Sequence, residues 1–94
     1  MISSGIGGGA FILVHDSKTK NNTFIDARET APAASNPTMF EGEPASSSTD
    51  GARAVAVPGE LRGLYRLWEE FGSLEWREVV RPARDLAVEG FVVR

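Results

Sequence analysis

An uninterrupted apolar run near the N-terminus places the strongest constraint on this chain. The run is Phe11–Val14, and it includes the β-branched residues Ile12 and Val14. Apolar side chains on both faces are typical of a central strand that is covered on each side. We therefore predict a buried strand here, and such a strand needs neighbours.

A second strand is predicted directly after the first. Ser17–Asn22 is polar and has turn-forming residues, and Thr23–Ala27 returns to strand-like composition. This order favours a β-hairpin. Because two strands alone are only marginally stable, the rest of the core must come from elsewhere.

The segment from Thr30 to Arg53 follows neither the helical nor the strand period. Its composition predicts a flexible loop over residues 41–52. A connection of this length indicates function, disorder or a missing packing partner, and the sequence leaves these alternatives open. Ala54–Val57 is then predicted to be a short third strand.

Two helices are predicted after Pro58 and Gly59. Apolar residues recur at helical spacing in both segments: Leu61, Leu64, Tyr65, Trp68 and Phe71, then Trp76, Val79, Val80, Ala83, Leu86 and Ala87. This spacing indicates amphipathic helices. Gly72 and Gly90 are the natural ends, and Pro82 is expected to kink the second helix or split it.

Composition excludes several classes of function. With 94 residues and a net charge of −3, the chain forms at most one small domain. Its scattered basic residues predict no nucleic-acid partner. No run approaches the ~18 apolar residues of a membrane span, and no leader pattern is visible, so we expect no membrane contact from this segment. The absence of Cys removes disulfides and thiolate chemistry but leaves the compartment open.

The single histidine, His15, follows the predicted strand without a serine on a strand-to-helix elbow. We expect a hydrogen-bonded structural role for it rather than a catalytic one. The carboxylates that could bind a metal do not have calcium-loop spacing: Asp26, Glu29, Glu41 and Glu43. We therefore predict no metal and no cofactor.

The glycine cluster Gly5–Ala10 formally satisfies the dinucleotide pattern G-x-G-x-x-A. That mechanism needs a strand before the glycines and a helix after them, which is not the order here. We favour a structural role in which the glycines let one backbone approach another closely. A free-standing phosphate-binding module remains an alternative. Separately, Asn21-Asn22-Thr23 is a possible glycosylation site at Asn21.

Arg28 leaves the end of the second predicted strand, where a sheet presents side chains to a pocket. Its guanidinium suits bidentate binding of a carboxylate or phosphate. The alternative is a surface ion pair with Asp26 or Glu29. Residue chemistry leaves both interpretations open.

Four ordered motifs resemble the gamma-glutamyltransferase family, also called glutathione hydrolases. The motifs are Ser4-Gly5-Ile6-Gly7-Gly8-Gly9-Ala10-Phe11, Ala27-Arg28-Glu29-Thr30-Ala31-Pro32-Ala33, Ala54-Val55-Ala56-Val57-Pro58-Gly59-Glu60 with Gly63, and Leu74-Glu75-Trp76 with Pro82-Ala83, Leu86-Ala87 and Gly90-Phe91. The resemblance covers nearly the whole chain except residues 41–51. Glu75 replaces the family's usual proline, and Arg53 stands where glycine is common.

The resemblance implies an α+β fold. It would be a fragment of the αββα sandwich of N-terminal nucleophile hydrolases, with about three strands followed by two helices. Residues 1–94 would be part of the large subunit and no complete domain. The implied partners are the remainder of the large subunit and the small subunit of the same self-cleaving precursor.

The resemblance also implies a reaction. The family cleaves the γ-glutamyl amide of donors such as glutathione and passes the acyl group through a threonine ester to water or to an amino-acid or peptide acceptor. The Thr-Thr-His segment that carries this nucleophile has no counterpart here, so no catalytic residue is assigned. Arg28 would bind the donor α-carboxylate, with Glu29 and Thr30 in supporting roles. Family members are typically secreted, periplasmic or anchored outside the cell, which the resemblance implies for the parent protein. The alternative is that the chain is a short inactive relative of the family that acts as a binding or interaction protein.

Overall fold

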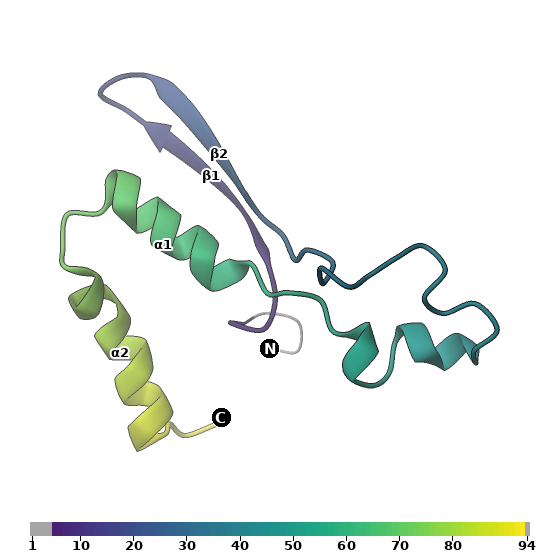
Figure 1. Ribbon diagram of the computed structural model, residues 1–94. Helices are drawn as coiled ribbons and strands as arrows, with labels where there is room; N and C mark the ends of the chain where they lie inside the picture. The colour runs from purple at the N-terminus through teal and green to yellow at the C-terminus, as the bar shows by residue number, and fades with distance from the viewer. Residues whose placement is uncertain (1–4, 94) are drawn as a thin grey trace. The chain divides into compact units, whose positions relative to one another are not determined.

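The computed structural model describes residues 5–93, so Ser4 of the glycine-rich motif lies outside the described residues. In chain order the elements are β1 (Ala10–Asp16), β2 (Asn21–Ala27), the 3-10 helices η1 (Ala45–Ser48) and η2 (Ala52–Ala54), α1 (Glu60–Phe71) and α2 (Trp76–Glu89) (Figure 1). The chain divides into two compact units at Gly63. Over residues 5–93 the fold is α+β, with two antiparallel strands and two α-helices.

The predicted hairpin is confirmed, and both strands extend beyond their predicted bounds. β1 pairs with β2 so that Ile12 lies opposite Ile25. At the turn, the Asp16 carboxylate accepts hydrogen bonds from the Lys18 N–H at 2.8 Å and the Thr19 hydroxyl at 2.7 Å. The Thr19 hydrogen bond is the largest cause of the lowered pKa of Asp16. These bonds fix the turn locally.

The two faces of the hairpin differ in burial. Ile12 and Val14 on one face are half-buried, whereas Leu13 on the other face is 75% exposed. The rings of Phe11 and Phe24 stack on this open face with centroids 5.8 Å apart. Among the described residues, β1 is therefore partly covered on one face and open on the other, rather than covered on both faces as predicted. Ala27 is their one buried apolar side chain.

The predicted third strand, Ala54–Val57, is wrong. Ala54 ends η2, with its N–H donating to the Gly51 carbonyl at 3.1 Å. Only Val57 pairs, in an isolated antiparallel bridge with Thr30. Pro58 follows at once and has no N–H to continue a ladder, which explains why the pairing stops.

The helices begin and end close to their predicted bounds. α1 ends before Gly72, whose N–H donates to the Trp68 carbonyl at 2.7 Å. α2 begins after Glu75, whose N–H donates to Glu78 Oε2 at 3.3 Å. Pro82 lies inside a continuous α2, so the predicted split does not occur. One donor is lost there, but the helix on either side supplies enough hydrogen bonds to continue.

Aromatic rings pack within the second unit. The centroid of Tyr65 lies 5.2 Å from those of Trp68 and Trp76. The Trp68 Nε1–H also donates to the Leu74 carbonyl at 2.6 Å, which ties the connection between the helices to α1. Within residues 5–93 no helix has the length and apolarity needed to cross a bilayer.

Lys20 is the described non-glycine residue with a positive φ, at 61°. Lys20→Gly should raise the free energy of unfolding of the natural protein by about 0.5–1 kcal/mol, because the Cβ clash of the left-handed region disappears. Chemical denaturation would measure it. Lys18→Gly is the matched control in the same turn, and an equal gain there would contradict the strain at Lys20.

Candidate functional site

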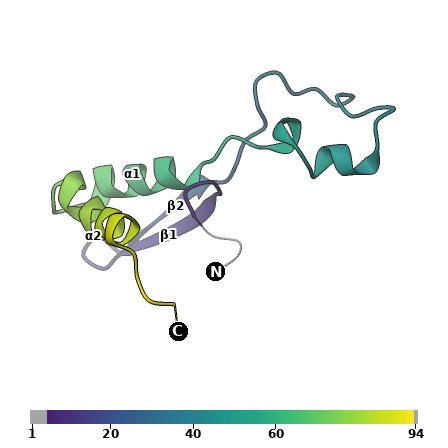
Figure 2. The ribbon, with the colours of Figure 1, turned by 90° about the horizontal axis from the view of Figure 1, so that it is seen from below.

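Three segments that are distant in the sequence meet at the end of β2. The Gly8 carbonyl accepts hydrogen bonds from the N–H groups of Gly59 at 3.0 Å and Glu60 at 3.1 Å. The Thr30 and Val57 backbones exchange hydrogen bonds of 3.1 and 2.9 Å. The intervening segment thus leaves β2 and returns beside it (Figure 2). Three of the sequence motifs are brought together in this way.

The glycines are needed because these backbones approach closely. A Cβ placed on Gly9 would lie 2.6 Å from Glu29 Oε2 and 2.8 Å from the Ala27 carbonyl oxygen. A Cβ placed on Gly59 would clash with the carbonyls of Ala27 and Arg28. The predicted structural role of the glycine cluster is confirmed at Gly9. The cluster is followed by β1 rather than by a helix, so the dinucleotide geometry is not formed.

Arg28 stands just beyond β2, with its side chain 61% exposed. Its Nε lies 3.4 Å from Glu29 Oε2, and its Cζ lies 5.8 Å from the Phe11 ring centroid. The Asp26 carboxylate instead accepts the Arg28 backbone N–H at 3.0 Å. Of the two surface pairs weighed from the sequence, the structure therefore forms the one with Glu29.

The pair with Glu29 uses only one edge of the Arg28 guanidinium. Within the described part of the chain, neither Nη nitrogen of Arg28 has a hydrogen bond or an ion pair. A guanidinium fork of this kind can donate two parallel hydrogen bonds to a carboxylate. The arrangement anchors the arginine on its Nε side and leaves donors available for an anionic ligand.

Glu29 is held against the glycine loop. Its side chain is 28% exposed, and its Oε2 is buried without a hydrogen-bond partner among the described residues. The distance of 3.4 Å to Arg28 Nε is longer than a charge-assisted hydrogen bond, so the contact is mainly electrostatic. A buried carboxylate oxygen is costly unless charge compensates it. Arg28 supplies a compensating charge. The sequence offered this ion pair as an alternative, but it did not indicate the close contact of Glu29 with Gly9.

The remaining candidate residues lie on the hairpin. His15 Nδ1 is 2.8 Å from Asn22 Oδ1 across the strand pair, which confirms a hydrogen-bonded role at an exposed position. Asn21 is exposed at the start of β2, and its glycosylation stays a prediction. Within residues 5–93 no three His, Asp or Glu side chains gather closely enough to hold a metal.

Gly9→Ala should disturb this site more than an alanine elsewhere in the same loop. The new Cβ would press on the Ala27 and Arg28 backbones, so we expect the free energy of unfolding to fall by about 1–3 kcal/mol. Gly7→Ala is the matched control, because a Cβ placed on Gly7 would have no atom within 4 Å. Denaturation of both variants measures the difference, and equal stability would argue against the close approach.

Comparison with known proteins identifies relatives of the whole chain. The family model described as Gamma-glutamyltranspeptidase matches residues 1–94. Scoloptoxin SSD14 of Scolopendra dehaani is 50% identical over 91 residues, which cover 97% of this chain and 16% of that protein. Glutathione hydrolase 3 of Arabidopsis thaliana is 45% identical over 92 residues, which cover 98% of this chain and 14% of that protein. The chain thus spans about one-seventh of the length of these relatives.

Solved structures agree with the sequence matches. The crystal structure of Helicobacter pylori gamma-glutamyltranspeptidase superposes with a TM-score of 0.85 at 32% identity, covering 94% of this chain and 26% of that one. Gamma-glutamyltranspeptidase from Pseudomonas nitroreducens complexed with L-DON gives a TM-score of 0.78 at 38% identity, covering 87% of this chain and 25% of that one. The family match and the shared fold lead to one conclusion: this chain belongs to the gamma-glutamyltranspeptidase family.

Proposed function

We propose that this chain is part of a gamma-glutamyltransferase, or glutathione hydrolase, and that Arg28 binds the α-carboxylate of the γ-glutamyl donor. The observation that carries the proposal is the state of the Arg28 guanidinium. Its Nε edge is paired with Glu29, and both Nη donors are free of partners within the described residues. Relatives named glutathione hydrolase support glutathione as the type of donor.

The proposed binding mode follows from the geometry of the two charged groups. A planar fork that is already fixed at Nε loses less rotational freedom when it binds a carboxylate. Glu29 supplies the fixed negative charge, and the glycine loop holds Glu29 in place. The Phe11 ring lies beside the guanidinium and contributes a cation–π contact.

The proposed reaction is cleavage of the γ-glutamyl amide, with transfer of the acyl group to water or to an amino-acid or peptide acceptor. We assign its threonine nucleophile to a small subunit of the same precursor, outside this chain. No threonine of the chain is proposed for that role: Thr19, Thr23, Thr30, Thr38 and Thr49. Turnover would then require the remainder of the precursor.

We further propose that residues 1–94 are no complete domain and belong to the αββα sandwich of N-terminal nucleophile hydrolases. The open face of the hairpin supports this, because Phe11, Leu13 and Phe24 are 60–75% exposed. A patch of large apolar side chains in water is costly. Packing against the remainder of the large subunit would cover it.

Arg28→Lys in the full-length enzyme should weaken donor binding by about 2–5 kcal/mol, because an ammonium group cannot reproduce the two-point contact with a carboxylate. The measurement is the dissociation constant of a γ-glutamyl donor analogue. Arg84→Lys is the matched control, since Arg84 also pairs with the acidic residue that follows it, Asp85, at 2.9 Å. Unchanged donor affinity in Arg28→Lys would refute the assignment.

A further inference from the structure

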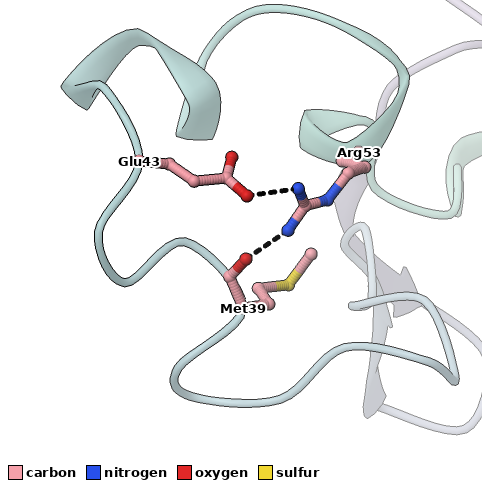
Figure 3. A network of polar contacts seen from close by, with 3 residues as sticks. All are labelled: Met39, Glu43 and Arg53. Carbon is pink, nitrogen blue, oxygen red and sulfur yellow. Dashed lines mark hydrogen bonds and ion pairs between the residues drawn. The ribbon is translucent and has the colours of Figure 1, made fainter.

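The guanidinium of Arg53 contacts three groups that lie earlier in the first unit of the chain. Arg53 Nη1 donates to Glu43 Oε1 at 2.5 Å, and Nη2 donates to the Met39 carbonyl oxygen (Figure 3). The Arg53 Cζ also lies 5.2 Å from the Phe40 ring centroid. Two nitrogens and one face of the guanidinium are therefore engaged at once.

These contacts suit arginine and no other side chain. The planar guanidinium donates in its own plane and stacks on an aromatic ring through its face. A lysine ammonium would keep the charge but could not hold Glu43, the Met39 carbonyl and the Phe40 ring in this arrangement.

The cluster closes a segment of the chain on itself. Met39 and Arg53 are 14 positions apart, which matches the ~6–16 residues of compact loops whose ends meet and whose own side chains fill them. Inside the segment, the Ser47 N–H donates to the Pro44 carbonyl at 2.9 Å and the Asp50 N–H to the Ser46 carbonyl at 2.8 Å. Its backbone hydrogen bonds are thus made locally.

We propose that Arg53 closes residues 39–53 into an Ω loop through its contacts with Glu43, the Met39 carbonyl and the Phe40 ring. The segment that composition predicts to be flexible then has a conformation of its own. The Thr30–Val57 bridge joins the two ends of the longer connection that contains this loop. This inference does not depend on the proposed function.

Limited proteolysis of the natural full-length protein tests whether Arg53 holds the loop closed. A glutamate-specific protease can cut after Glu41, whereas the bond after Glu43 is resistant because Pro44 follows. Arg53→Lys should be cut after Glu41 about tenfold faster than the wild type, because a loop opens more often once its closing contacts are lost. Mass spectrometry of the fragments gives the site and the rate.

Arg66→Lys is the matched control, since Arg66 pairs with Glu69 and Glu70 on α1. It should be cut at the wild-type rate. Equal cleavage of Arg53→Lys and the wild type would overturn the proposal, as would rapid wild-type cleavage at Glu41. If Arg53→Lys fails to fold, hydrogen exchange of the wild-type Glu41 and Glu43 amides decides, and no protection there would overturn it as well.

Loop closure should also depend on pH. The Arg53 hydrogen bond is the main reason that the pKa of Glu43 is lowered, and Ser47 contributes a smaller hydrogen bond. Asp50 lines the same hollow, of about 200 Å³, together with Glu43 and Arg53, and it is the other acidic residue of that lining. A carboxyl whose pKa is lowered in the closed loop favours closure above its ordinary pKa. This contribution is lost as the pH falls through the lowered value.

Protection factors of the loop amides should therefore fall on acidification of the wild type. Glu43→Gln should have low protection that no longer changes over this pH range. Glu41→Gln, in the same loop without an ion pair among the described residues, should behave like the wild type. A Glu43→Gln variant that keeps the wild-type pH dependence would contradict the role of the pair.

Discussion

The candidate site depends on the close approach of the glycine loop to the end of β2. The Gly8 carbonyl receives the N–H groups of Gly59 and Glu60, which are among the donors that a helix leaves unpaired at its N-terminus. The same loop leaves space for Glu29 because Gly9 has no side chain. One backbone contact thus sets the start of α1 and the position of the Arg28–Glu29 pair together.

Arg53 and Arg28, both in the first unit, differ in how many of their hydrogen-bond donors are available to a ligand. Arg53 uses both Nη nitrogens and the face of its guanidinium within the described residues, so it is suited to holding a loop. Among residues 5–93, Arg28 is paired at Nε alone, and its Nη donors have no partner there. The number of donors already engaged, rather than exposure, separates them, since the two side chains are 61% and 56% exposed.

Burial in the chain is slight for its content of large apolar residues. Leu13, Phe91 and Val93 are each at least 75% exposed, and Ala27 is the one buried apolar side chain among residues 5–93. Within the described residues, the hairpin, the helices and the loop are therefore hydrogen-bonded locally but bury little apolar area. Such local order gains little from the hydrophobic effect, which scales with the apolar area removed from water.

The sequence by itself determined the hairpin and both helices, because strand composition, helical spacing and the stops at Gly72 and Gly90 act over a few neighbouring residues. It also indicated Arg28 as a candidate anion-binding residue, through guanidinium chemistry and the family motif. Tertiary structure decided that Ala54–Val57 pairs only at Val57, that Glu29 rests on the glycine loop, and that Arg53 reaches back to Met39. These three outcomes depend on contacts between residues far apart in the chain, and no local pattern encodes such contacts.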